Sequence, residues 1–263
     1  MRLLGQGREA EVFEWGDGTV LRLFRPGAGR LIDHEDAALR AARAGAVRVP
    51  ALYGRESVDG RPGLVMERID GEDGITRLAR RPWQLRRVAV GLGRIHASVH
   101  AVEAPASLAA LRTTLERRIE SVEQLPSRLR TFALGELRAL PDGDRLLHGD
   151  FHPGNVLVGD AGPVVIDWTN ATRGDPDADV ARSALMGKLG EMPPGTPWLL
   201  RSLDRFGRGA YNRLYLRAYA RERRFDEAMV RRWTIPHAAA RLAERIEEEV
   251  DALLELLTAA ARH

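Results

Sequence analysis

The sequence contains no cysteine and almost no lysine. Without cysteine the chain can form no disulfide and cannot use a thiolate in catalysis. Of its forty lysines and arginines only Lys188 is a lysine, so arginine carries nearly all of the positive charge throughout the chain. An arginine at any single position therefore follows this general bias and is not by itself a sign of lost activity.

Long hydrophobic runs and a strong net charge are also missing. The first residues lack the apolar run of a signal peptide, and no segment approaches about eighteen uninterrupted apolar residues. We therefore expect a cytoplasmic protein without a membrane partner. The formal net charge of +3 over 263 residues gives little support for nucleic-acid binding. This length and an apolar content of 44% suffice for two lobes, each with its own core.

The most informative segment, at 148–155, reads His-Gly-Asp-Phe-His-Pro-Gly-Asn. Two short apolar runs follow at 156–158 and 164–166, and the turn residues between them predict a β-hairpin. Antiparallel pairing brings opposite chain ends together, so Asn155 before the first strand and Asp167 after the second should lie side by side. Two oxygen-donating side chains at one sheet edge suit Mg²⁺.

Asp150 precedes Asn155 by five residues, which is the separation in the kinase catalytic loop H-x-D-x-x-x-x-N. In that loop the aspartate orients or deprotonates the attacking hydroxyl, while the asparagine and a later aspartate hold metal. We therefore assign Asp150 to catalysis, and Asn155 and Asp167 to metal binding. His148 and His152 are better suited to orienting the loop through hydrogen bonds.

These eight positions, with Ile-Asp-Trp at 166–168 and Arg-Gly-Asp-Pro at 173–176, resemble the aminoglycoside phosphotransferase and choline kinase superfamily. The resemblance implies a protein-kinase-like α+β fold with two lobes. The first would be a small N-terminal antiparallel sheet lobe over 1–68, and the second a larger, mainly helical C-terminal lobe over 69–263. The resemblance also implies Mg²⁺ as cofactor, ATP or GTP as phosphoryl donor, and a small-molecule hydroxyl as acceptor.

The N-terminal residues agree with this resemblance. Residues 3–13 fit a strand, a glycine turn and a second strand, with Ala10 where a protein kinase carries its third glycine. Small residues above a nucleotide let backbone N–H groups approach phosphate oxygens. We therefore expect this loop to cover the phosphates through Gly5, Gln6, Gly7 and Arg8.

The strand at 20–24 departs from the family pattern, because Arg22 stands where kinases carry the phosphate-binding lysine. Lys188 follows the catalytic motif and cannot be the missing residue by its position. A guanidinium can still bond phosphate oxygens and a carboxylate, although its reach differs from that of an ammonium. The resemblance implies Glu35, near the start of a helical stretch, as the acidic partner of Arg22.

An apolar strand ends within 64–71, where we expect the boundary between the lobes. In the family this segment is the hinge whose backbone meets the adenine, which makes Glu67 and Ile69 candidates for main-chain contacts. The resemblance also implies that Asp179 braces the catalytic loop.

Three further segments carry structural expectations. Apolar residues at helical spacing predict a helix over 83–100, where the two histidines suit packing or surface roles rather than metal ligation. The loop at 190–197 is either a substrate lid or an inert surface loop. A final helix is expected over about 235–261. Its acidic face, which includes Glu244, would either hold a cationic acceptor or, as we favour, be solvated and paired with nearby arginines.

The sequence therefore predicts an Mg²⁺- and nucleotide-dependent kinase that phosphorylates a small-molecule hydroxyl. A protein-serine/threonine kinase is disfavoured because Ile-Asp-Trp replaces Asp-Phe-Gly and no Ala-Pro-Glu segment follows. The alternative from another class is a catalytically silent nucleotide-binding module that acts through partners, which Arg22 leaves open. The acceptor stays open among aminoglycosides, other antibiotics, sugars and amino alcohols, and the sequence indicates no oligomeric state.

Overall fold

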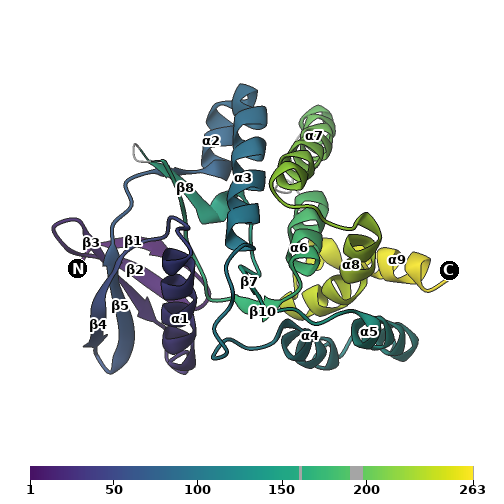
Figure 1. The fold of residues 1–263 in the computed structure, drawn as a ribbon, viewed down its shortest axis with the longest axis horizontal. Coiled ribbons are helices and arrows are strands. Elements are labelled where there is room, and N and C mark those ends of the chain that lie inside the picture. Colours follow the sequence, from purple (N-terminus) through teal and green to yellow (C-terminus); the bar gives the residue numbers. More distant parts are fainter. Residues whose placement is uncertain (160–161, 190–197, 263) are drawn as a thin grey trace.

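The N-terminal part of the chain is an antiparallel sheet covered by one helix (Figure 1). The computed structural model describes residues 1–159, 162–189 and 198–262, apart from the side chains of 198–206. In spatial order the strands are β1 (Leu3–Gln6), β2 (Ala10–Gly16), β3 (Thr19–Phe24), β5 (Arg61–Glu67) and β4 (Leu52–Val58). The covering helix is α1 (Arg30–Ala44).

The register of this sheet and the face of α1 together position one ion pair. Strand β3 lies between β2 and β5, and Arg22 is opposite Val12 on one side and Leu64 on the other. In α1 the buried positions recur every three or four residues, so Glu35 shares the inward face with residues such as Leu39. A buried carboxylate on the helix therefore faces the arginine of the sheet.

Strand β5 ends at Glu67, next to the boundary that we propose at residue 68. A second, three-stranded sheet follows in the order β6 (Glu72–Asp73), β8 (Val156–Gly159) and β9 (Gly162–Val165). Asp73 is the N-cap of helix α2 (Gly74–Arg80), because its side chain accepts hydrogen bonds from the N–H groups of Ile75 and Thr76. Helix α3 (Leu85–Val99) confirms the helix predicted over 83–100.

The rest of the chain is mainly helical, which confirms the predicted α+β class (Figure 1). Its remaining elements are α4 (Leu111–Glu120), α5 (Ser127–Ala139), β7 (Arg145–Leu147), β10 (Thr172–Gly174), α6 (Pro176–Leu189), α7 (Trp198–Glu222), α8 (Glu227–Arg241) and α9 (Glu247–Ala260). Helix α3 packs on α7, and α8 packs on α4, α5, α6 and α9. Within the described residues, no helix is both long enough and apolar enough to span a membrane.

Two large apolar cores hold these parts. The first runs from Phe24 and Leu39 in the sheet lobe through Leu92 of α3 to Tyr215 of α7. The second lies among α4, α5, α6, α8 and α9. The first core therefore joins the N-terminal sheet and α1 to helices α3 and α7.

The prediction of one helix over 235–261 is wrong. Helix α8 ends at Arg241, a short 3-10 turn covers Leu242–Glu244, and Arg245 adopts a left-handed conformation with φ 55° before α9 begins. Apolar periodicity did not reveal this break, because Leu242 and the apolar residues of α9 are buried in the same core. The possible lid at 190–197 lies outside the described residues.

The α3–α7 contact requires glycine at position 93. A Cβ there would lie 2.5 Å from the carbonyl oxygen of Tyr215 and 2.9 Å from the Cβ of Ala218. Gly91 lies two residues earlier on the same helix, and a Cβ there would meet no atom within 4 Å. The two glycines therefore differ in packing but not in secondary structure.

We expect Gly93→Ala to lower the free energy of unfolding by about 1–3 kcal/mol, because the added methyl forces two packed helices apart. Gly91→Ala is the matched control and should raise stability by up to about 1 kcal/mol through helix propensity. Urea unfolding of both variants measures the difference. Equal stabilisation by both substitutions would contradict the close α3–α7 approach.

Candidate active site

The β8–β9 hairpin brings Asn155 and Asp167 together, as the sequence predicts. Val156 pairs with Val165, and the N–H of Ile166 donates to the carbonyl oxygen of Asn155 at 3.0 Å. Both Asn155 and Asp167 line one cavity. Asp167 lies two residues after the second strand and has a left-handed backbone, with φ 62°.

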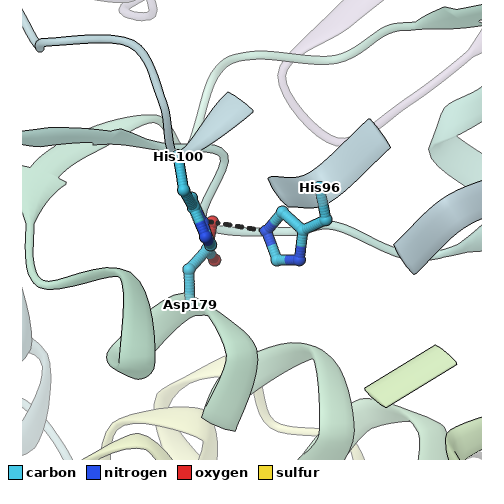
Figure 2. A group of neighbouring side chains, drawn as sticks. All are labelled: His96, His100 and Asp179. Carbon is cyan, nitrogen blue, oxygen red and sulfur yellow. Dashed lines mark hydrogen bonds and ion pairs between the residues drawn. The ribbon is translucent and has the colours of Figure 1, made fainter. Parts of the chain in front are cut away.

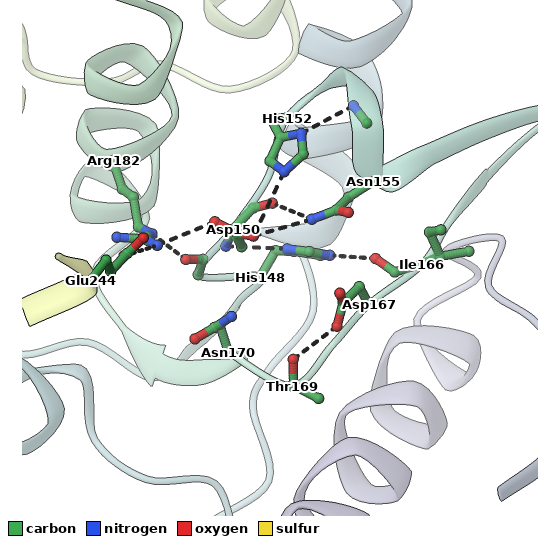
Figure 3. A network of polar contacts seen from close by, with 12 residues as sticks. His148, Asp150, His152, Asn155, Ile166, Asp167, Thr169, Asn170, Arg182 and Glu244 are labelled. Carbon is green, nitrogen blue, oxygen red and sulfur yellow. Dashed lines mark hydrogen bonds and ion pairs between the residues drawn. The ribbon is translucent and has the colours of Figure 1, made fainter. Parts of the chain in front are cut away.

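Asp150 lies at the centre of a polar network (Figure 3). Its backbone oxygen and Oδ2 accept from Asn155 Nδ2 at 2.9 and 3.3 Å, and its Oδ1 accepts from Arg182 Nη2 at 3.1 Å. His152 Nε2 lies 3.6 Å from Oδ2. Burial alone raises the pKa of Asp150, but His152 and the positive charge of Arg182 outweigh it and hold that pKa well below its ordinary value. The carboxylate is therefore charged across the neutral range.

The histidines of the motif make hydrogen bonds that shape the loop. The Nε2 atom of His148 lies 3.0 Å from the carbonyl oxygen of Ile166, and His152 Nδ1 accepts from the N–H of Gly154 at 3.0 Å. Gly149 has φ 74°, and a Cβ there would lie 2.1 Å from the carbonyl oxygen of Asn170. A residue other than glycine would therefore displace the loop that carries Asp150.

Asp179 of α6 holds the same loop from behind. Its Oδ2 accepts from the backbone N–H of His148 at 2.7 Å, and its Oδ1 accepts from that of Gly149 at 3.1 Å. The rings of His96 and His100 also face Oδ2, at 3.1 and 3.3 Å from their Nε2 atoms (Figure 2). All three side chains are buried.

This His96–His100–Asp179 cluster has three possible metal ligands within 4.8 Å of one another. Its atoms are nevertheless engaged in hydrogen bonds. The Nδ1 atoms of His96 and His100 lie 2.6 and 2.7 Å from the hydroxyls of Tyr215 and Tyr219, and Asp179 serves the catalytic loop. The cluster is therefore a buried hydrogen-bond network that holds the backbone of the catalytic loop.

Arg22 contacts two acids at once. Its Nε donates to Glu35 Oε2 at 2.9 Å, and its Nη2 donates to Asp167 Oδ1 at 2.8 Å. Burial lowers the pKa of Arg22, but Glu35 and Asp167 outweigh this effect and raise it. Burial also raises the pKa of Glu35, although Arg22 opposes the shift. The arginine therefore joins α1 and the sheet to the hairpin.

A cavity of about 1270 Å³ joins most of these groups. Of the sequence-predicted residues, Gly7, Arg8, Arg22, Asp150, Asn155 and Asp167 line it. Glu35 lies behind Arg22 and is buried. Gly5, Gln6, Glu67 and Ile69 are not among the lining residues.

The hinge candidate Glu67 already has several partners. Its carboxylate accepts from Arg48 at 2.8 Å and from the N–H of Ala51 at 3.1 Å, while its own N–H donates to the carbonyl oxygen of Ala51 at 2.8 Å. The backbone N–H of Glu67 is therefore committed to the chain, and an adenine contact through Glu67 would have to use its carbonyl oxygen.

Sequence reasoning missed Arg182 and misplaced Glu244. Arg182 Nη2 bridges Asp150 Oδ1 and Glu244 Oε1, at 3.1 and 3.0 Å (Figure 3). Arg182 follows Asp179 by three residues and so lies on the same helix face, which is the signal that could have indicated it. The expected pairing of Glu244 with a nearby arginine is found, because Arg241 donates to its Oε2 at 3.1 Å. The expected solvated face is not found, because the break after α8 directs Glu244 into the cavity. Glu248, Asp251 and Glu255 are exposed, as expected.

Comparisons with known proteins agree with this arrangement. A family model described as the phosphotransferase enzyme family matches residues 1–217. Two similar solved structures, each 21% identical, are an aminoglycoside-3'-phosphotransferase of type VIII and a macrolide 2'-phosphotransferase apoenzyme from Brachybacterium faecium. The first covers 88% of this chain and 89% of its own with a TM-score of 0.63, and the second covers 97% and 91% with a TM-score of 0.58.

A third similar structure is an amicoumacin kinase in complex with AMP-PNP, Ca²⁺ and Ami. It is 13% identical, covers 99% of this chain and 88% of its own, and has a TM-score of 0.68. At these identities the likeness shows a shared fold alone. No curated protein sequence matches the chain at a significant level.

The buried histidines make stability depend on pH. Burial lowers the pKa of His96 to about 4 and that of His237 to about 3, from an ordinary 6.5. Between these values the unfolded chain binds protons that the folded chain does not, so their contribution to stability is complete above about pH 6.5 and falls as the pH decreases. Asp177, whose pKa burial raises to about 6, acts in the opposite direction between pH 3.8 and 6.

We expect the free energy of unfolding to be lower at about pH 5 than at about pH 7.5, because the lowered pKa values of the buried His96, His100, His148 and His237 outweigh the raised pKa values of Asp177 and Glu35. Each histidine contributes up to about 1.4 kcal/mol per pH unit inside its window. Urea unfolding at the two pH values measures the change. Equal stability at both values would mean that these histidines are not buried in the neutral form.

Proposed function

The chain belongs to the phosphotransferase enzyme family, and we propose that it is a small-molecule kinase that transfers the γ-phosphoryl group of ATP or GTP to a hydroxyl. The observation that carries this proposal is the meeting of Asp150, Asn155 and Asp167 in one cavity with the glycine loop and Arg22. These are the parts that phosphoryl transfer needs to position two substrates and neutralise charge. The similar amicoumacin kinase holds AMP-PNP and Ca²⁺, which supports a nucleotide donor and a divalent cation here.

The side chains of Asn155 and Asp167 fit a hard divalent cation. Asn155 donates through Nδ2 to Asp150, which leaves its Oδ1 for a metal. Asp167 uses Oδ1 for Arg22 and Thr169, which leaves its Oδ2. Amide and carboxylate oxygens are the ligands that Mg²⁺ takes in proteins, and the bound ion would neutralise charge on the phosphate oxygens.

Asp150 would hold the acceptor hydroxyl. As the bond from the acceptor oxygen to the γ-phosphorus forms and the bond to the leaving nucleoside diphosphate breaks, the hydroxyl proton passes to a carboxylate oxygen of Asp150. Its lowered pKa makes Asp150 a weak base, so this transfer is late and orientation is the larger contribution. A loose transition state, in which the nucleophile needs little activation, suits such a residue.

Arg22 would bind phosphate oxygens beside Asp167, and we propose that the loop residues Gly5 to Arg8 cover the phosphates. Arg22 lines the cavity and is held by Glu35, as a phosphate-binding cation would be. The main chain near Glu67 and Ile69 remains our proposal for the adenine contact. The test of the whole proposal is a screen of hydroxyl compounds with ATP and GTP, followed by nucleoside diphosphate release.

We expect Asp150→Ala to reduce acceptor phosphorylation by about 10²–10⁴-fold while nucleotide affinity stays within a few-fold of wild type, because an orienting carboxylate contributes to the chemical step rather than to binding. Steady-state kinetics and calorimetric titration with nucleotide measure the two effects. Asp251→Ala, at an exposed position of α9, is the matched control. Near-normal turnover in Asp150→Ala would remove Asp150 from its assigned role.

We expect Arg22→Ala to lower kcat/KM by roughly 10–100-fold, since a charge-assisted hydrogen bond to phosphate is lost. Arg22→Lys should retain much of the activity, because it keeps the charge and is the usual residue of the family. Kinetics with varied nucleotide measure both variants. Wild-type kinetics in Arg22→Ala would place phosphate binding elsewhere. A wild type inactive toward a broad panel, with activity only in Arg22→Lys, would favour the silent module.

A further inference from the structure

The acceptor side of the cavity has few carboxylates available to bind a ligand. Within the described residues, four carboxylates line the cavity: Glu9, Asp150, Asp167 and Glu244. Glu9 lies in the glycine loop and Asp167 on the proposed metal side, so Asp150 and Glu244 remain for the acceptor.

Both of these carboxylates are already paired with arginine. Glu244 Oε1 accepts from Arg182 at 3.0 Å, and its Oε2 accepts from Arg241 at 3.1 Å. Asp150 Oδ1 accepts from Arg182 at 3.1 Å. A cationic acceptor would therefore meet carboxylates whose negative charge arginine already compensates, so its own charge would gain little attraction from them.

Arg118 of α4 presents the opposite situation. Its Nη2 donates to Asn170 Oδ1 at 2.8 Å, but its Nη1 lies 4.0 Å from Glu244 Oε1, which is too far for a hydrogen bond. Among the described residues Nη1 has no hydrogen-bond acceptor, and the side chain is 31% exposed at the cavity wall. This guanidinium can therefore bind an oxyanion by donating a hydrogen bond from Nη1.

The surrounding charges leave Arg118 incompletely compensated. Burial and the positive charge of Arg182 lower the pKa of Arg118, and the acids Glu244 and Asp150 offset this only in part. An anion bound beside Arg118 would supply the missing compensation. Contacts also link Arg118 to Asp150: Arg118 Nη1 lies 4.0 Å from Glu244 Oε1, and Arg182 Nη2 donates both to that oxygen and to Asp150 Oδ1, at 3.0 and 3.1 Å. The two side chains are therefore within the span of a small acceptor.

From this geometry we infer that the acceptor carries a carboxylate or a phosphate group in addition to its hydroxyl, and that Arg118 binds this oxyanion while Asp150 holds the hydroxyl. The inference rests on the proposed phosphoryl transfer to a hydroxyl at Asp150. Apolar side chains of Ile75, Leu78 and Met186 line the same cavity and would contact the body of the acceptor. A guanidinium suits either oxyanion because it can donate two parallel hydrogen bonds.

Matched acceptors test the charge preference directly. One set is 4-(hydroxymethyl)benzoate, its amide and the corresponding benzylamine. A second set is gluconate, glucose and glucosamine, with glucose 6-phosphate to separate phosphate from carboxylate. Initial rates of nucleoside diphosphate release, corrected for release without acceptor, give kcat/KM for each compound.

We expect the anionic members to exceed their neutral and cationic partners by about tenfold or more in kcat/KM. Arg118→Gln should remove this preference by raising KM for the anions, with little change for the neutral compounds. Arg117→Gln is the matched control, because Arg117 is the exposed neighbour on the same helix. It should leave the preference unchanged, and circular dichroism verifies that both variants fold.

Preference for the amines, or an unchanged preference in Arg118→Gln, would overturn the inference while leaving the kinase proposal intact. If no compound is phosphorylated, the kinase proposal fails for this panel, and calorimetric titration of the anions into protein with bound ADP decides the inference separately. In that case the inference requires that the anions bind to the wild type and that Arg118→Gln weakens their binding about tenfold. Anions that do not bind, or that bind both variants equally, would overturn it.

Discussion

The candidate site depends on the hydrogen bonds that the buried carboxylate of Asp179 accepts from the catalytic loop. Burial alone would raise the pKa of Asp179, but hydrogen bonds from His100 and His96 hold it well below its ordinary value. The charged carboxylate accepts hydrogen bonds from two backbone N–H groups, those of His148 and Gly149, and these two groups must point toward it. A buried charge is costly unless hydrogen bonds replace those it made with water, so loop conformations that move either N–H group away from Asp179 are disfavoured.

A chain of alternating charges extends from that loop toward the C-terminus. Arg182 joins Asp150 to Glu244, and Arg241 joins Glu244 to Glu249 of α9. These side chains are mostly buried, so each charge is compensated by its neighbours rather than by water. The position of Asp150 therefore depends on the last two helices as well as on its own loop.

Local rules predicted the parts of the site that lie on regular elements. Hairpin geometry places Asn155 beside Asp167, and the pairing of Arg22 with Glu35, implied by family resemblance, is found at 2.9 Å. Arg182 was not predicted: its spacing from Asp179 places it on the helix face that meets the catalytic loop, but this spacing does not show that its side chain reaches Asp150, which is 32 residues away in sequence. The break at Arg245 escaped detection because helical periodicity continues across it, and the metal, nucleotide and hinge assignments remain proposals.

The match to the family model ends at residue 217, whereas Arg241 and Glu244 lie beyond it and reach back to Arg182. The groups that we assign to phosphoryl transfer thus precede this limit, and part of the cavity wall where we propose that the acceptor binds follows it. Arg182, which contacts both Asp150 and Glu244, joins the two portions. Under the proposed function, exchange of the terminal helices between relatives would change this part of the acceptor wall and leave the phosphoryl-transfer groups in place, provided that the incoming segment supplies a carboxylate to Arg182.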